Sequence, residues 1–144
     1  MDLTQILPNM VPFVGTVGIQ VDSIEPGTAT ATLPYRTEVG NHMGTAHAGA
    51  VYSLGETASG GVLLSVFADQ LGSAYIALKS AQVKHHKARP GDVVAQATLV
   101  GDAAATRAAY EATGKADFDV QVDLNVGDTR IAEVLYTWAV RKPR

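Results

Sequence analysis

The sequence contains no cysteine, and that absence removes several kinds of chemistry at the outset. Disulfide bonds, thiolate nucleophiles, thiolate-bound zinc and iron–sulfur clusters all require this side chain. Positive charge is also scarce, because 11 Lys and Arg stand against 14 Asp and Glu and give a formal net charge of -3 at pH 7. This balance argues against broad nucleic-acid binding, which needs a surplus of positive charge. Histidines, carboxylates and hydroxyls remain as the candidates for catalysis.

Long hydrophobic runs and targeting signals are missing as well. The longest apolar stretch, residues 60–68, is far shorter than a membrane-spanning helix. The first residues, Met1-Asp2-Leu3-Thr4, lack the basic start and apolar run of a signal peptide. We therefore expect a cytoplasmic protein with no membrane partner. With 144 residues, 47% of them hydrophobic, the chain is expected to form one domain over residues 1–144.

One long helix is predicted over residues 47–67. Its apolar positions recur three or four residues apart, as on one face of a helix: Val51, Leu54, Ala58, Val62 and Val66. Glu56 falls on a different side of this helix. Gly55, Gly60 and Gly61 each weaken the helix by about 1 kcal/mol relative to alanine, a cost that suits a helix surrounded by packing.

Strands are predicted both before and after this helix in the sequence. Alternating apolar residues indicate strands over 17–22, 28–33, 73–87, 93–100, 117–126 and 130–140. Residues 102–112 are rich in alanine at helical spacing and predict a short helix, and residues 3–14 predict another that is interrupted by Pro8 and Pro12. This order is typical of an α+β fold in which a curved antiparallel sheet wraps around one long central helix.

The densest group of chemically useful residues lies between residues 41 and 61. The N–H groups of Ala48 and Gly49 fall at the predicted helix start, where they can donate to a carbonyl oxygen that becomes negative during acyl transfer. Glu56 lies more than two turns further along. In an apolar setting its pKa would rise, and it could act as a general base or a nucleophile. The simpler interpretation of such a residue is a solvated helix carboxylate.

A resemblance to a known family rests on one pattern. The motif Asn41-x-x-Gly44-x-x-His47-Ala48-Gly49, with Glu56 nine residues after the histidine, resembles the hotdog-fold acyl-CoA thioesterases. The most similar group is the phenylacetate-pathway type with its uncharacterised relatives. In that family a His-Gly-Gly signature opens the central helix, so Ala48 departs from the pattern by one methyl group while it keeps the N–H donor.

The resemblance implies a role for each motif residue. Glu56 would activate water or attack the thioester, and the Ala48 and Gly49 amides would hold the carbonyl oxygen. Asn41 would orient the water or the substrate, although asparagine also suits a turn for conformational reasons alone. His47 would fix the loop rather than carry a proton. The family also places the site between two subunits, which implies a homodimer or a homotetramer, and needs no cofactor.

Substrate contacts are expected from two further groups of residues. The basic run at the end of the third predicted strand supplies Lys84, Lys87 and Arg89, which by resemblance would contact the phosphates of coenzyme A. The alternative is a charged strand edge that blocks unwanted pairing. Thr57 and Ser59 either bind the substrate or only pack. No histidine and carboxylate spacing in the sequence resembles a zinc site.

Three functions remain open at this point. The first is hydrolysis of an acyl-CoA thioester by Glu56. The second is hydration or dehydration of an acyl thioester on the same fold, which would use a histidine and an acidic residue that face each other across a dimer. The third is a module that binds acyl-CoA without catalysis.

Overall fold

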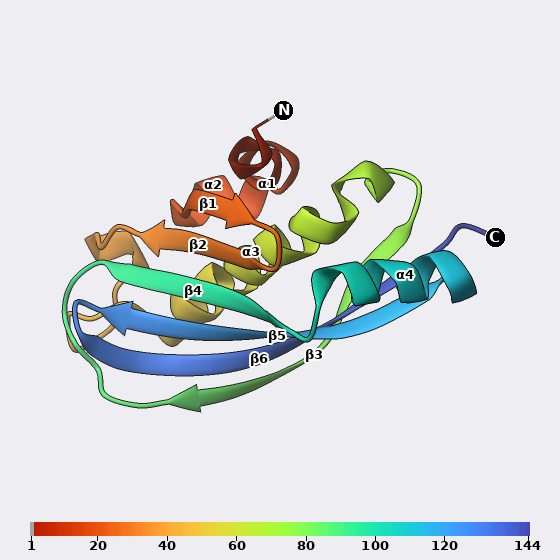
Figure 1. Cartoon of the computed structure of the whole chain (residues 1–144). Helices are drawn as coiled ribbons and strands as arrows, with labels where there is room; N and C mark the ends of the chain where they lie inside the picture. Colours follow the sequence, from red (N-terminus) through yellow and green to blue (C-terminus); the bar gives the residue numbers. More distant parts are fainter. Residues whose placement is uncertain (1) are drawn as a thin grey trace.

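The computed structural model describes residues 2–144, in which a six-stranded antiparallel sheet packs against one long helix (Figure 1). The strand order is β1-β2-β4-β5-β6-β3. The strands are β1 (Gln20–Glu25), β2 (Thr28–Leu33), β3 (Tyr75–His85), β4 (Val93–Val100), β5 (Lys115–Val126) and β6 (Thr129–Arg141). All neighbouring pairs in the sheet are antiparallel. The predicted α+β architecture, with a curved sheet around a central helix, is confirmed.

The central helix, α3 (Ala48–Phe67), is buried almost all the way round. From Leu54 to Leu64 every residue is buried except Glu56, which is half-buried. The prediction of a single apolar face was therefore too narrow, because Gly60 is buried on the side opposite the apolar stripe, next to Leu7. That side is covered by the N-terminal helices, which the periodicity of α3 cannot reveal. None of the helices described over residues 2–144 has the length and apolar character needed to cross a membrane.

The side of α3 away from the sheet is covered by the N-terminal strap, which comprises residues 3–17. It consists of η1 (Leu3–Gln5), α1 (Ile6–Met10) and α2 (Pro12–Val17), and Figure 1 shows α1 and α2 beside α3 and β1. Pro12 occupies the first position of α2, where its missing N–H is no loss. The helix interrupted by proline that we expected over residues 3–14 is thus two short helices and a 3-10 turn.

The strand that was predicted to start at residue 17 begins at Gln20 instead. Val17 ends α2, and Gly18 follows in the left-handed conformation with φ 86°. Arg36 reinforces this end, because its guanidinium donates to the carbonyl oxygens of Val17 at 2.6 Å and Thr16 at 2.9 Å. A cation on the last carbonyls of a helix satisfies groups that the helix itself leaves unpaired. Alternation over six residues could not separate this helix end from a strand.

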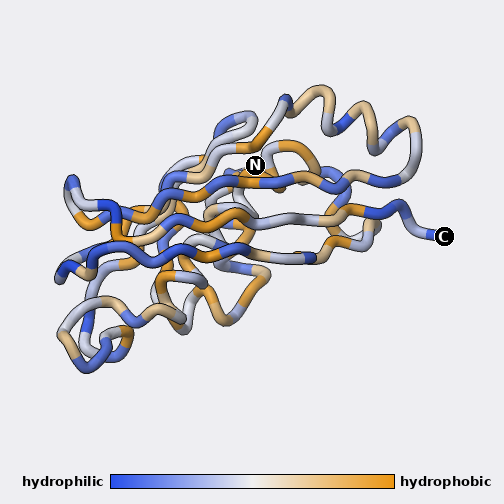
Figure 2. The backbone as a smooth tube through the Cα atoms, turned by 90° about the horizontal axis from the view of Figure 1, so that it is seen from below, coloured by the Kyte–Doolittle hydropathy of each residue, from blue (hydrophilic) through white to orange (hydrophobic). Residues whose placement is uncertain are grey.

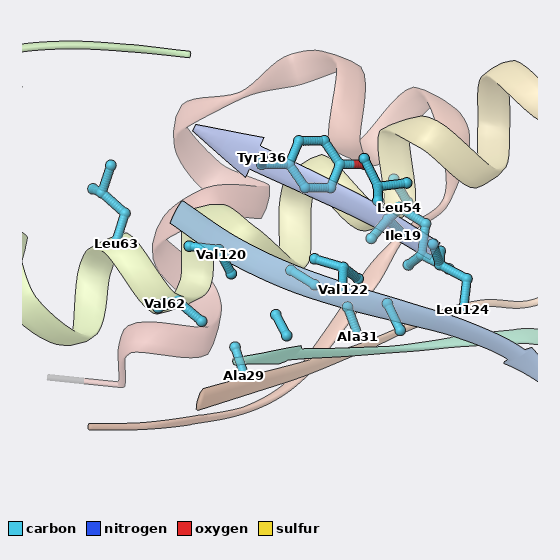
Figure 3. Close-up of a cluster of buried hydrophobic side chains, with 14 of the residues drawn as sticks. Ile19, Ala29, Ala31, Leu54, Val62, Leu63, Val120, Val122, Leu124 and Tyr136 are labelled. Atoms are coloured by element: carbon cyan, nitrogen blue, oxygen red, sulfur yellow. The ribbon is translucent and has the colours of Figure 1, made fainter. Parts of the chain in front are cut away.

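The core lies between the sheet and α3 (Figure 3). Figure 3 shows side chains of β2 and β5, among them Ala31, Val120 and Val122, gathered near Leu54 and Val62 of α3. Alternate residues of β5 are buried and the others are not. Figure 2 shows hydrophobic and hydrophilic residues alternating along strands of the sheet. This pattern is what a sheet with one covered face requires.

A second helix closes the far end of α3. The predicted short helix is confirmed as α4 (Ala103–Thr113), which Asp102 caps by accepting from the Ala105 N–H. Arg107 joins it to the 3-10 turn η3 (Ala68–Gln70), because its guanidinium donates to both carboxylate oxygens of Asp69 at 2.7 and 2.8 Å. The same guanidinium lies against the Tyr110 ring. The remaining 3-10 turn, η2 (Thr37–Val39), lies in the loop before α3.

At Gly55, α3 lies close to Tyr136 of β6. The Tyr136 hydroxyl donates to the Tyr52 carbonyl oxygen at 2.7 Å, and a Cβ at Gly55 would collide with that hydroxyl. Tyr136 is fully buried and stacks at a tilt against Tyr52, with ring centroids 5.5 Å apart. Glycine is therefore required here by packing, although it weakens the helix locally.

We predict strong coupling between Gly55 and Tyr136. Gly55→Ala should lower the free energy of unfolding by about 2 kcal/mol, because the added methyl displaces the buried ring. In a Tyr136→Phe background the same change should cost less than about 1 kcal/mol, since the colliding oxygen is gone and alanine favours the helix. Urea denaturation of the four proteins gives the coupling energy. Equal costs in both backgrounds would contradict the assignment.

Candidate active site

Asn41 closes the loop that precedes α3. Its side-chain Oδ1 accepts from the N–H groups of Met43 at 2.9 Å and Thr45 at 3.1 Å, and its Nδ2 donates to the Thr45 hydroxyl at 2.8 Å. Gly40 and Ala46 pair across the base of the loop. Both polar atoms of Asn41 are thus engaged within its own loop, which is the turn-forming role that asparagine favours.

His47 caps the start of α3. Its Nδ1 accepts from the Gly49 N–H at 2.9 Å. The Gly49 amide is consequently not free to hold a carbonyl oxygen in this arrangement, contrary to the role expected for it. The Ala48 amide has no hydrogen-bond partner among residues 2–144 and lies at the exposed first position of the helix. It is the available donor at the positive end of α3.

Glu56 lies in the middle of α3 without any ionic partner. Within the described part of the chain its carboxylate makes neither an ion pair nor a hydrogen bond, although the residue is half-buried. Burial raises the pKa of the Glu56 carboxyl above its ordinary value. A carboxylate that is desolvated and left unpaired destabilises a fold, so it marks a candidate functional site.

Glu56 opens into a pocket between α3 and the N-terminal strap, which we call the strap pocket. Its volume is about 270 Å³. The lining residues are Leu7, Val11, Phe13, Val14, Ser53, Glu56, Thr57, Gly60 and Trp138. The walls are predominantly hydrocarbon, and Glu56 is the charged group among them.

A second, more polar hollow leads from the start of α3 to the strap pocket. This helix-start groove has a volume of about 430 Å³ and shares Phe13 and Ser53 with the strap pocket. It also contains Arg36, His47 and Gly49. The two hollows therefore adjoin at Phe13, so that one elongated molecule can extend past the start of α3 toward Glu56.

Two predicted substrate contacts on α3 differ in their positions. Thr57 lines the strap pocket, and its hydroxyl donates to the Ser53 carbonyl oxygen at 2.7 Å. Ser59 is fully buried and lies outside the lining, where its hydroxyl accepts from Trp138 Nε1 at 2.9 Å and donates to the Glu56 carbonyl oxygen at 2.7 Å. Ser59 thus orients the indole that lines the pocket and does not reach the pocket itself.

Seven of the nine lining residues were not among the candidate site residues of the sequence analysis: Leu7, Val11, Phe13, Val14, Ser53, Gly60 and Trp138. For Ser53 a signal was present, because Ser53, Glu56, Thr57 and Gly60 follow the three- and four-residue spacing of one helix face. The four strap residues and Trp138 of β6 lie far from the motif in sequence. Only the tertiary packing brings them to Glu56.

A third hollow gathers other predicted residues, and we call it the β3-end pocket. It has a volume of about 250 Å³. Among its lining residues are Asn41, Ala48, Lys87 and Arg89. Lys84 lies outside it and approaches Glu133 at 3.7 Å. Within one chain, Ala48 therefore lines one pocket and Glu56 another.

The two basic residues Lys87 and Arg89 of the β3-end pocket differ in their hydrogen bonds. Arg89 donates to Asp128 at 3.0 Å and to the Thr129 hydroxyl at 2.6 Å, whereas Lys87 is exposed. Across residues 2–144, no three histidine, aspartate or glutamate side chains are grouped so that they could hold a metal ion.

Comparison with known proteins places the chain in a family. Residues 2–140 match the family described as a domain of unknown function, DUF4442. The chain belongs to the DUF4442 family. None of the curated proteins matches it.

Solved structures show which folds this DUF4442 member shares. A Pseudomonas aeruginosa protein of unknown function, described as a probable thioesterase, is 23% identical with a TM-score of 0.82 over 98% of this chain and 94% of that one. A thioesterase family protein from Silicibacter pomeroyi is 16% identical with a TM-score of 0.78, covering 98% and 96%. A mutant of the phenylacetic acid degradation protein PaaI from Thermus thermophilus is 20% identical with a TM-score of 0.67, covering 90% and 98%. The DUF4442 chain thus has the hotdog fold of thioesterase-like proteins.

The unpaired carboxylate predicts an effect on stability. Because burial raises the pKa of Glu56, the folded state holds this proton more tightly than the unfolded state, and stability falls as the pH rises through the folded pKa. Glu56→Gln, which mimics the protonated form, should therefore raise the Tm at neutral pH. The gain should vanish at pH values below the ordinary glutamate pKa.

Thermal melts across that pH range measure the difference. Glu25→Gln provides the matched control. Glu25 is an exposed carboxylate at the end of β1, and it forms no ion pair with any of residues 2–144. A Glu56→Gln protein that melts at or below the wild-type Tm at neutral pH would refute the buried-charge assignment.

Proposed function

We propose that this DUF4442 protein is a thioesterase that hydrolyses an acyl-CoA to the free acid and coenzyme A, with Glu56 as the catalytic carboxylate. The observation that carries the proposal is the half-buried, unpaired Glu56 in a pocket of hydrocarbon walls. The hotdog-fold neighbours described as thioesterases support the same reaction class. No metal or cofactor enters the reaction as proposed.

The chemistry requires a base, an electrophile and a place for the developing charge. As a general base, the Glu56 carboxylate removes a proton from water while the water oxygen bonds to the thioester carbonyl carbon. The carbon–sulfur bond then breaks, and the departing thiolate takes the proton from Glu56. As a nucleophile, Glu56 would form an anhydride by displacing the thiolate, and water would then cleave the anhydride. A low-polarity pocket favours both routes, because it makes the carboxylate more basic.

The Ala48 amide is the proposed donor to the carbonyl oxygen during either route. It lies at the positive end of α3 and is free, whereas the Gly49 amide is held by His47. Ala48 and Glu56 line different pockets of one chain. We therefore propose that the complete site forms between two copies, with Ala48 and Asn41 from one subunit and Glu56 from the other. Lys87 and Arg89, which lie beside Ala48, would then contact the coenzyme A phosphates.

The edge of the sheet offers the surface for such a pairing. β3 is 11 residues long, ends the sheet, and bonds to β6 on one side only. Its exposed residues include Tyr75 and Val83. A long edge strand with apolar side chains is a template for pairing with another chain. Pairing of β3 with its copy would extend the sheet across a two-fold axis.

A second candidate function is acyl-CoA binding without hydrolysis. It is favoured by one observation, that Asn41 and the Gly49 amide are both occupied by bonds within their own segment. Hydration or dehydration has less support. These reactions would need His47 to accept a proton, but its Nδ1 already accepts from the Gly49 N–H as the cap of α3. A thiol-release assay separates these functions.

Glu56→Gln is predicted to lower the rate of thiol release from acyl-CoA by a factor on the order of 10² to 10⁴, because the general base or nucleophile is lost. Thiol release is measured over short, medium, long and aromatic acyl-CoA substrates, with Glu25→Gln as the control. An enoyl-CoA in the same panel tests hydration. Unchanged release by a folded Glu56→Gln protein would exclude the proposed role of Glu56. Binding without thiol release by the wild type would favour the second function.

The wild-type protein is predicted to sediment as a dimer or a dimer of dimers rather than at 15.1 kDa. Val83→Asp should shift it toward the monomer, because a charge would be buried at the paired β3 edge. Val94→Asp is the matched control, since Val94 has a similar exposure of 37% against 39% but lies on the interior strand β4. A wild type that sediments as a monomer at all concentrations would overturn the shared site.

A further inference from the structure

We infer that the strap pocket binds the hydrocarbon part of the substrate, and that this substrate is a linear, saturated acyl group of medium length. The inference rests on the proposed function for the thioester itself. It adds which hollow takes the acyl group, which residues limit its length, and why an aliphatic chain fits better than an aromatic ring.

The position of Glu56 sets the direction of the acyl chain. Glu56 and Ser53 lie one turn apart on the same face of α3, and Ser53 belongs to both the strap pocket and the helix-start groove. A carbonyl carbon in reach of Glu56 therefore has the polar groove on one side and the hydrocarbon pocket on the other. The desolvation of the hydrocarbon favours the apolar side for the acyl chain.

The walls of the strap pocket suit a flexible aliphatic chain. Leu7, Val11 and Val14 contribute branched hydrocarbon from the strap. Trp138 contributes an indole whose polar Nε1 is already bonded to Ser59, so that no free donor is left to demand a polar ligand atom. The hydroxyls of Ser53 and Thr57 also line the pocket, and both donate to backbone carbonyl oxygens of α3. The acyl chain therefore meets one charged group, Glu56, two bonded hydroxyls and otherwise hydrocarbon.

The volume limits the length of the chain. An apolar protein cavity of about 150 Å³ binds benzene, which has six carbon atoms, so the 270 Å³ of the strap pocket has room for roughly ten carbon atoms. At Gly60, a Cβ would lie 3.4 Å from Leu7 Cδ1, in ordinary contact. Alanine is therefore tolerated at this position, but it narrows the pocket where the strap crosses α3.

Phe13 forms the gate between the two hollows. It lines both of them and is nevertheless 59% exposed. An exposed phenylalanine on a short helix has little to hold it in a monomer, and a hydrocarbon chain beneath it would bury its ring. Met10 is a natural comparison, because it lies on the same strap with a similar exposure of 55% but lines neither hollow.

The test uses Trp138, the single tryptophan of the chain, as a reporter inside the pocket. Decanol brominated at its last carbon is titrated into the wild-type protein, because bromine quenches indole fluorescence on contact and this neutral alcohol needs no hydrolysis. We expect saturable quenching, and weaker binding of brominated hexadecanol and of brominated phenylethanol. Tighter binding of the aromatic alcohol, or no saturable quenching by brominated decanol, would overturn the inference.

Three variants connect the pocket to the substrate. Phe13→Ala should weaken decanol binding by several-fold, Gly60→Ala should shift the preference toward a shorter alcohol, and Met10→Ala should leave binding unchanged. In the thiol-release assay, decanoyl-CoA should exceed acetyl-CoA and palmitoyl-CoA in kcat/KM by at least about tenfold. Equal effects of Phe13→Ala and Met10→Ala would assign the effect to general surface hydrophobicity and refute the pocket.

The two proposals can fail separately. Saturable quenching together with no thiol release from any acyl-CoA would uphold the pocket and remove the hydrolase. Thiol release that depends on Glu56 but not on Phe13 or Gly60, without quenching of Trp138, would uphold the hydrolase and place the acyl group elsewhere.

Discussion

The structure depends on the complete enclosure of α3. The sheet covers one side and the N-terminal strap the other, so that the helix has almost no exposed face in its middle three turns. Among the polar side chains of these turns, the hydroxyls of Thr57 and Ser59 form hydrogen bonds. Glu56 remains desolvated and unpaired. Such a group destabilises a fold, and for this reason the proposed function rests on Glu56.

The enclosure also explains the glycines of α3. Gly55 lets the Tyr136 hydroxyl reach the helix backbone, and Gly61 lets the helix approach Ala29 of β2, where a Cβ would lie only 2.9 Å away. Each glycine weakens the helix in isolation and strengthens its packing. The helix is consequently stable only as part of the fold, which ties the position of Glu56 to the packing of β6 and β2 around it.

The proposed division of the site between two subunits rests on the same geometry. A single helix carries both the free Ala48 amide at its start and Glu56 two turns later, yet the two face separate hollows. Pairing at the β3 edge would allow one copy to complete the other. The strap then serves two purposes, since it buries the outer side of α3 and forms the wall of the pocket in which Glu56 lies. Arg36 fixes its end at Val17.

The sequence alone predicted the six strands, apart from the start of the first, and the long helix, because alternation and helical spacing are local signals. It also indicated Glu56 as the candidate catalytic carboxylate. It did not show that Val17 ends a helix, that Ser59 is buried behind Trp138, or that His47 engages the Gly49 amide. These features depend on contacts between residues far apart in the chain or on side-chain orientation. Periodicity reports which side of an element is apolar, but only the tertiary structure decides what covers the other side.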